Sequence, residues 1–190
     1  MSLVSIFIAA AFVNNFVFYR FLGICPFLGI SKRLSAALSM GIAVTFVMVV
    51  SSMATWLIQR FFLDPFDLPF LRYVSFILII ASLVQLIEMY MKKKYEKMYN
   101  VFGIYLPLIT TNCAILGLVL LSSLLGYSFL ESLIFALGAG FGFTLALSIM
   151  AGIREKLDVS NIPNALKGIP IALIIAGLLA LAFGGFSGMI

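Results

Sequence analysis

The two cysteines are the residues of this chain best suited to chemistry, and they sit in matching motifs. Cys25 and Cys113 each open the five-residue phrase Cys-x-x-Leu-Gly, which ends at Gly29 and Gly117. The same offset of 88 residues separates the two cysteines and the two glycines. Free thiols pack as small apolar groups, form disulfides or bind metals. The repetition favours a metal site, and the other two interpretations stay open.

Two thiolates do not complete a metal site. Structural zinc takes four ligands, and a [2Fe–2S] cluster is usually held by four cysteines. The chain has only these two cysteines and no histidine. We therefore expect Cys25 and Cys113 to form half of a site, with the remaining ligands supplied by another chain. This chain holds no complete active site and no catalytic residue of its own.

The composition is that of an integral membrane protein. Of the 190 residues 64% are hydrophobic and 10% are charged, and the mean hydropathy is +1.21. A soluble domain usually carries about 25% charged residues. The net charge of +5 lies in short loops between apolar runs, which argues against a nucleic-acid partner. We read the first apolar run as a retained span, because it lacks the basic start and cleavage site of a signal peptide.

Apolar runs of about 20 residues are long enough to cross a bilayer as helices. The sequence predicts six of them in a single membrane domain, residues 1–190. They cover residues 3–29, 36–58, 70–91, 101–125, 129–153 and 169–189. The predicted fold class is therefore all-α, with six transmembrane helices and short connections.

Loop charges predict the orientation. One side receives Lys32, Arg33, Lys92, Lys93, Lys94, Lys97, Arg154, Lys156 and Lys167, and the other receives only Arg60 and Arg72. Loops rich in lysine and arginine stay in the cytoplasm. Both termini are therefore expected on the outer side of the membrane.

The cysteine motifs predict an inverted repeat. Three spans separate them, so the second half (about residues 100–190) enters the membrane upside down relative to the first (about residues 1–95). The thiols can then meet only near the bilayer midplane. A continuous helix would carry Cys25 almost to the far side, so we expect the first and fourth spans to be broken near the cysteines. Asn14, Asn15, Thr110, Thr111 and Asn112 are candidates to bond the freed backbone groups.

Two intramembrane charges remain ambiguous. Arg20 could offset negative charge at the thiols, reach an interface or contact a partner. Glu88 is a functional candidate because it is a carboxylate in a span, but Lys92 lies four residues on and favours an ordinary helical ion pair.

Several runs of this sequence resemble the A-type membrane proteins of the Rnf electron-transport complex, and the similarity covers essentially the whole chain. The E-type proteins of the sodium-pumping NADH:quinone reductase are a related family. The runs that carry the resemblance are residues 13–17 (VNNFV), 21–32 (FLGICPFLGISK), 106–114 (LPLITTNCA), 152–157 (GIREKL) and 182–188 (AFGGFSG).

The resemblance implies a component of the bacterial or archaeal inner membrane with six spans in inverted repeat. It implies pairing with a homologous membrane subunit of the E type, and a [2Fe–2S] cluster held between them by two cysteines from each. On this chain the two cysteines map onto Cys25 and Cys113. Further partners are of the B, C, D and G types, in which flavins and other iron–sulfur centres reside. The complex passes electrons between ferredoxin and NAD and moves Na⁺ or H⁺.

The leading hypothesis is therefore an electron relay across the bilayer, within a translocase-type oxidoreductase. Gly23, Thr111, Asn112 and Gly117 are the candidates to hydrogen-bond the cluster sulfurs. The rival is a secondary transporter or channel-like membrane subunit without a redox centre, since inverted repeats and broken helices are typical of transporters. A third hypothesis is an inert scaffold, in which both cysteines are dispensable.

Overall fold

The structure of the chain is a computed structural model, and the residues that it describes are almost entirely helical or in turns. These residues are 2–31, 33–63, 69–94, 108–109, 111–160, 163 and 166–185. The elements are α1 (Leu3–Ile8), η1 (Ala9–Val13), α2 (Ile24–Ile30), α3 (Leu34–Ile58), η2 (Gln59–Leu63), α4 (Pro69–Lys94), α7 (Cys113–Leu124), α8 (Phe129–Val159) and α9 (Ile169–Gly184). The predicted all-α class is confirmed, with η1 and η2 as short π-helical turns.

Three helical stretches are long and apolar enough to cross a membrane, namely Leu34–Phe62, Leu71–Tyr90 and Phe129–Val159. They match the second, third and fifth predicted spans. Shorter apolar helices, Leu3–Val13, Cys113–Leu124 and Ile169–Gly184, lie in the other three. At 1.5 Å per residue a 12-residue helix rises only about 18 Å, less than the hydrocarbon core of about 30 Å. Six full crossings therefore remain a prediction.

The first predicted span is interrupted beside Cys25, as expected. Helix η1 ends at Val13, a series of turns follows, and α2 begins only at Ile24. Pro26 fits into α2 because it lies in the first turn, where a backbone N–H has no helical partner. In the fourth span α7 begins at Cys113, after Asn112 in an extended conformation. Residues 101–107 and 110 lie outside the described residues.

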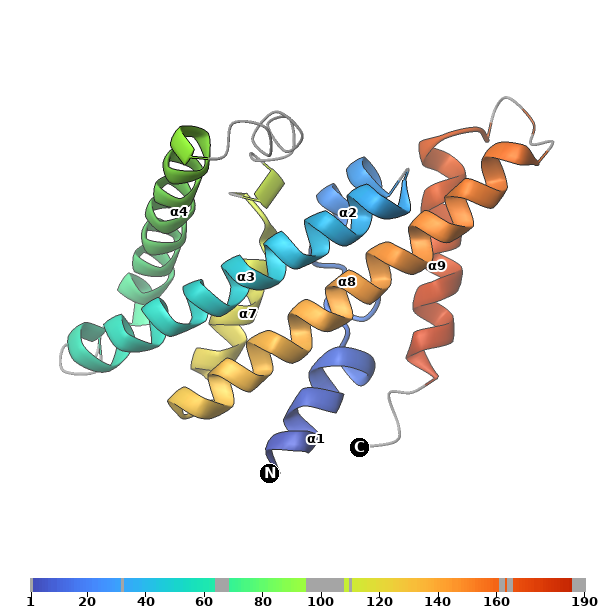
Figure 1. Cartoon of the computed structure of the whole chain (residues 1–190). Coiled ribbons are helices and arrows are strands. Elements are labelled where there is room, and N and C mark those ends of the chain that lie inside the picture. The colour runs from blue at the N-terminus through green and yellow to red at the C-terminus, as the bar shows by residue number, and fades with distance from the viewer. Residues whose placement is uncertain are drawn as a thin grey trace.

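Helices α3 and α8 lie side by side across the centre of the molecule and run in opposite directions, with α4 on one flank and α9 on the other (Figure 1). They cross at two reciprocal contacts. A Cβ added to Gly41 would lie 2.6 Å from Thr144, and one added to Gly140 would lie 2.5 Å from Thr45. Each threonine hydroxyl also donates to the carbonyl of the glycine on its own helix: Thr45 to Gly41 at 2.7 Å, and Thr144 to Gly140 at 2.9 Å. The glycine of each helix thus meets the threonine of the other. A two-fold axis that relates the two halves of the chain would produce this reciprocal pattern.

Several predicted loop bases lie within helices, and Arg154 is the one that is also buried. Arg154 was expected in a cytoplasmic loop, but α8 continues to Val159, and only 9% of Arg154 is exposed. The assignment was wrong because no glycine or proline after Gly152 stops the helix before Val159. The side chain finds acceptors on α2 and the residue after it instead of water.

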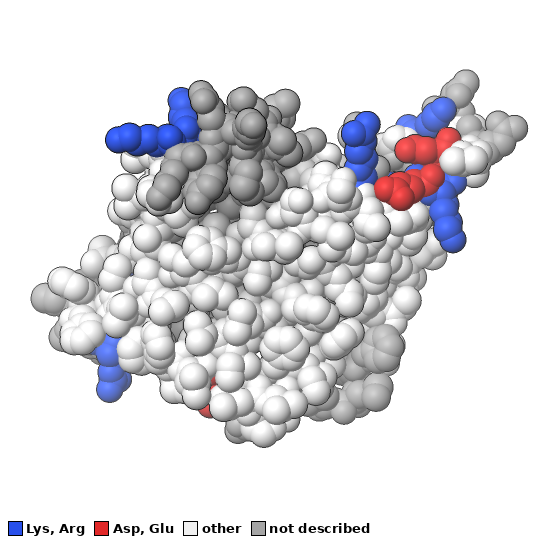
Figure 2. All heavy atoms as spheres, viewed as in Figure 1, with Lys and Arg blue, Asp and Glu red and all other residues white. Residues whose placement is uncertain are grey.

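Charged side chains gather at opposite edges of the molecule. Figure 2 shows most of the lysine, arginine, aspartate and glutamate atoms of this face at the upper edge, over the ends of α4 and α8. A few lie at the lower edge, and the middle is free of charge among the residues shown in colour. Large apolar side chains such as Ile42, Phe46 and Leu181 are exposed, which suits a surface that faces lipid. The start of α1 and the end of α9 lie toward the same lower edge (Figure 1), and the membrane side of the termini remains a prediction.

Candidate functional site

The structure brings the two cysteine motifs together. Cys25 is the second residue of α2, and Cys113 is the first residue of α7. The backbone N–H of Gly23 donates to the Sγ atom of Cys113 at 2.9 Å. Cys25 follows two residues after Gly23 and is exposed, while Cys113 is half-buried. Two thiols that are far apart in sequence therefore belong to one small region.

Gly23 is the residue that allows this approach. Its φ of +80° lies in the left-handed region, which side chains other than glycine rarely adopt. A Cβ at this position would lie 2.6 Å from Phe143 and 3.3 Å from Ala114. Any larger residue would therefore push the Gly23 amide away from the Cys113 sulfur.

Asn112 begins α7 and carries a buried donor that has no partner in the described part of the chain. Its Oδ1 atom accepts from the N–H of Ala114 at 3.0 Å and so caps the helix. The side chain is 5% exposed, and its Nδ2 atom makes no hydrogen bond to any described residue. Native structures rarely leave a buried donor unpaired. Its position next to Cys113 and near Gly23 suits a group that is bound at the thiols.

Thr111 and Gly117 are the other two residues that the sequence predicts to hydrogen-bond the cluster sulfurs. Thr111 precedes Asn112 and is exposed at the turn. Gly117 lies four residues into α7, where its bare Cα lets the side chain of Leu22 pack closely. The contacts around Gly117 in the described part of the chain therefore give it a packing role.

Asn15 holds the break in the first span. It is fully buried, and its Nδ2 atom donates to the carbonyl of Gly142 at 2.9 Å and to that of Ala11 at 3.2 Å. Its Oδ1 atom accepts from the N–H groups of Val17 and Phe18 at 3.0 and 3.3 Å. Unpaired backbone groups cost several kcal/mol each in hydrocarbon. One amide therefore stabilises the irregular segment that leads to Cys25.

The segment that precedes α2 is exposed and strained. Tyr19 and Phe21 are 47% and 55% exposed, and Arg20 between them is exposed with its guanidinium 5.9 Å from the Tyr19 ring centroid. Phe21 has a φ of +54°, which is an outlier for a bulky residue. Such strain clusters at functional segments. These three residues and Cys25 define the exposed cysteine face.

The described residues offer two cysteine thiols as candidate metal ligands, which is half of a four-ligand site. No group of three or more histidine, cysteine, aspartate or glutamate side chains within them could hold a metal ion. The thiols, the Gly23 amide and the unpaired Asn112 amide fit an anionic, sulfur-containing group. Such a group needs two further ligands, and the exposed cysteine face is where another chain could provide them.

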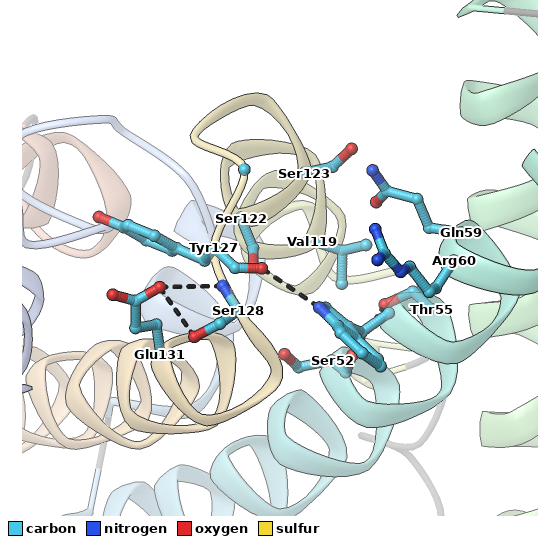
Figure 3. Close-up of a pocket in the computed structure, with 12 residues that line it drawn as sticks. Ser52, Thr55, Gln59, Arg60, Val119, Ser122, Ser123, Tyr127, Ser128 and Glu131 are labelled. Carbon is cyan, nitrogen blue, oxygen red and sulfur yellow. Dashed lines mark hydrogen bonds between the residues drawn. The ribbon is translucent and has the colours of Figure 1, made fainter. Parts of the chain in front are cut away.

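A second polar region lies at the opposite edge, where α3, α7 and α8 meet around a cavity of about 540 Å³ (Figure 3). Trp56 donates through Nε1 to the carbonyl of Tyr127 at 3.2 Å, and Glu131 accepts from the N–H and the hydroxyl of Ser128, both at 2.9 Å. Burial, and to a smaller extent the Glu131 carboxylate, raises the pKa of the Tyr127 phenol.

The comparisons with known proteins identify the family. The model of the Rnf-Nqr subunits, which are membrane proteins, matches residues 3–190, almost the whole chain. The chain belongs to the Rnf-Nqr family of membrane proteins.

Rnf-Nqr relatives of high identity carry consistent names. The chain is 56% identical over 189 residues to the A subunit of the Na⁺-translocating ferredoxin:NAD⁺ oxidoreductase complex of Acetobacterium woodii, covering 100% of this chain and 98% of the relative. It is 55% identical, with the same coverage, to the A subunit of an ion-translocating oxidoreductase complex of Syntrophotalea carbinolica. The relative of the same name from Azoarcus sp. is 50% identical, covering 96% of this chain and 94% of the relative.

Sequence reasoning missed parts of this Rnf-Nqr protein. The cavity gave only a weak signal, the serine pairs 51–52 and 122–123 in apolar runs. The unpaired Asn112 amide depends on geometry that spacing does not reveal. Glu88, a functional candidate by its place in a span, is half-buried in α4, a helix that packs against α3 and α7.

Proposed function

We propose that this chain is the A-type membrane component of an ion-translocating ferredoxin:NAD oxidoreductase complex. We propose further that it relays electrons across the bilayer through a [2Fe–2S] cluster shared with a homologous, E-type membrane subunit. The names of its relatives support the first statement. The second rests mainly on the hydrogen bond from Gly23 to Cys113, which joins the two cysteine motifs.

In this proposal Cys25 and Cys113 each bind iron through their sulfur atoms. The bound cluster would supply one-electron transfer at a position that soluble carriers do not reach. The Gly23 N–H would stabilise negative charge on the Cys113 sulfur, and the Asn112 Nδ2 atom, which has no partner among the described residues, would donate to a cluster sulfur. Phe143 and Ala114 pack near Gly23 and are fully buried, so they keep water from this side of the site.

The exposed cysteine face supports the shared character of the site. Cys25 is exposed in the isolated chain, although cysteine is among the most frequently buried residue types. Tyr19, Arg20 and Phe21, in the segment before α2, are exposed as well, and aromatic residues and arginine are enriched at protein interfaces. The E-type partner would cover this face and provide two cysteines.

The wider assignment follows from the same proposal. The protein would lie in the bacterial or archaeal inner membrane with both termini outside, built as two inverted three-helix repeats. Partners of the B, C, D and G types would complete the complex. Redox change at the cysteines would then be coupled to movement of Na⁺ or H⁺.

The test is spectroscopic. Cys25→Ser and Cys113→Ser variants, produced with the E-type partner, should each lose the electron paramagnetic resonance signal of the reduced [2Fe–2S] cluster. Ser123→Ala changes a buried hydroxyl at the opposite edge and is the matched control, which should keep the signal. Full retention of the signal in either cysteine variant would contradict the shared cluster.

A transporter without a redox centre is the second candidate. The broken first span and the hydroxyl-lined cavity favour it. The purified chain alone, reconstituted in liposomes, would then conduct Na⁺ or H⁺ without redox partners. The electron-relay proposal expects flux no greater than that of empty liposomes.

A further inference from the structure

The turn between α2 and α3 is held by two neighbouring residues of α8. The Nη1 atom of Arg154 donates to the carbonyl of Leu28 at 2.8 Å and to the hydroxyl of Ser31 at 3.1 Å. The Oε1 atom of Glu155 accepts from the N–H of Leu34 at 3.0 Å. Arg154 therefore binds the end of the helix that carries Cys25, and Glu155 binds the start of α3.

The sign of each charge suits the helix end that it meets. The last carbonyls of a helix have no partner within it and carry partial negative charge, so a guanidinium stabilises them. The first N–H groups carry partial positive charge, so a carboxylate stabilises those of α3. Ser31 extends the contact because its hydroxyl also donates to the carbonyl of Phe27. The last turn of α2 is thereby bonded to α8 through a charged group.

Helix α2 needs external support because it has only seven residues. Isolated helices shorter than about 12 residues are marginal, since few hydrogen bonds offset the cost of nucleation. Helix α8 supplies this support at three levels. The Gly142 carbonyl accepts from Asn15 before the break, Phe143 lies against Gly23 at the start of α2, and Arg154 binds its end.

Burying Arg154 costs more free energy than burying an apolar side chain of similar size would. It is 9% exposed, and burial of a guanidinium costs free energy unless its donors are paired. A flexible apolar side chain such as methionine would pack there without that cost. The directional bonds to Leu28 and Ser31 are what the guanidinium adds.

We propose that Arg154 is a positioning residue for the cysteine pair. Its guanidinium fixes the end of α2 against α8, and this sets the position of Gly23 and Cys25 relative to the Cys113 sulfur. The inference deepens the proposed function and rests on it only for the identity of the group that the thiols bind.

The primary test measures the rate at which the Cys113 thiol reacts, because the Gly23 N–H covers its sulfur. In a Cys25→Ser background, the full chain in detergent is freed of iron with a chelator and treated with N-ethylmaleimide. Arg154→Met should raise the labelling rate of Cys113 about tenfold, because a hydrogen bond to a charged group is lost. Arg154→Lys, which keeps a cationic donor but loses the guanidinium geometry, should raise the rate less than Arg154→Met does. Lys156→Met, at an exposed site on the same helix, is the matched control and should not change the rate.

A second variant keeps the test decisive if Arg154→Met does not fold. Ser31→Ala removes one acceptor without altering α8 and should give an intermediate increase in the labelling rate. Parental labelling rates in folded Arg154→Met, or in Ser31→Ala, would overturn the inference.

A spectroscopic measurement separates this inference from the proposed function. In the complex with both cysteines present, Arg154→Met should change the line shape of the [2Fe–2S] signal, and Arg154→Lys should change it less. Absence of any cluster from the parent complex would refute the proposed function but leave the labelling result valid. An unaltered line shape in Arg154→Met, with a cluster present, would overturn the positioning role.

Discussion

Helices α2 and α7 each begin beside a cysteine, and each leads through a short turn into one of the two central helices. The opposite central helix holds each turn. At the α2–α3 turn, α8 provides Arg154 and Glu155. At the α7–α8 turn, α3 provides Trp56, whose indole donates to the Tyr127 carbonyl.

The two holding sites correspond in position but differ in chemistry. Trp56 follows Gly41 by the same number of residues as Glu155 follows Gly140. The first turn lies at the charged edge in Figure 2, and the charged side chains of Arg154 and Glu155 hold it. The second is held across the helices by an indole and by the serine hydroxyls of Ser122 and Ser132, whose Oγ atoms are 2.7 Å apart, and its only carboxylate among the described residues, Glu131, caps its own helix through Ser128. In both halves the turn is hydrogen-bonded to the opposite central helix. Charged side chains make these bonds at the first turn, and an indole makes the bond at the second.

The largest expected effect comes from comparing Asn15, which holds the irregular segment before α2, with Asn112, which caps the start of α7. Asn15→Leu removes the partner of four backbone groups in the first half and should cost about 4 kcal/mol or prevent folding. Asn112→Ser in the second half keeps a capping hydroxyl and should cost less than about 0.5 kcal/mol. Thermal unfolding in detergent compares the two. Equal losses would show that the breaks are held alike.

Next come two glycines with positive φ, Gly23 at the start of α2 and Gly126 in the α7–α8 turn. Gly23→Ala combines left-handed strain with a Cβ at 2.6 Å from Phe143, and should cost about 3 kcal/mol and expose Cys113 to maleimide. Gly126, with a φ of +64°, has no heavy atom within 4 Å of an added Cβ, so Gly126→Ala should cost only about 1 kcal/mol. Melting curves and thiol labelling separate them. A tolerant Gly23 would contradict its role at the sulfur.

The reciprocal contacts of α3 and α8 give a test of symmetry. Gly41→Ala and Gly140→Ala each place a Cβ against a threonine of the opposite helix and should each cost about 2 kcal/mol. A two-fold relation between the halves predicts that the two losses are equal in thermal unfolding. A loss at one position only would weaken the inverted repeat.

The last comparison concerns the tie at the α7–α8 turn. Trp56→Phe removes one hydrogen bond and keeps most of the aromatic packing against Phe129, so it should cost about 1 kcal/mol. The labelling rate of Cys113 should not change, in contrast to Arg154→Met. An increase in that rate would show that both turns position the cysteines.

Much of the fold could be predicted from patterns along the chain. Long apolar runs located α3, α4 and α8, and the Gly23–Pro26 region marked the break beside Cys25. Local signals sufficed there because span length and backbone breakers act over a few residues.

Features that depend on distant partners could not be predicted. Arg154 was counted as a loop charge, since its acceptors, Leu28 and Ser31, lie far away in the sequence. The contact of Gly41 with Thr144 depends on the register of two helices far apart along the chain. The sequence indicated that the thiols should meet, but the amide that meets Cys113 is visible only in three dimensions.

The central claim is that Cys25 and Cys113 are half of a shared metal site. The most direct test is the iron and acid-labile sulfide content of this chain purified with its membrane partner, compared with this chain alone. We predict a pair that contains iron and sulfide in the proportions of one [2Fe–2S] cluster, and neither element in the isolated chain. A stoichiometric cluster in the isolated chain, or none in the pair, would contradict the account.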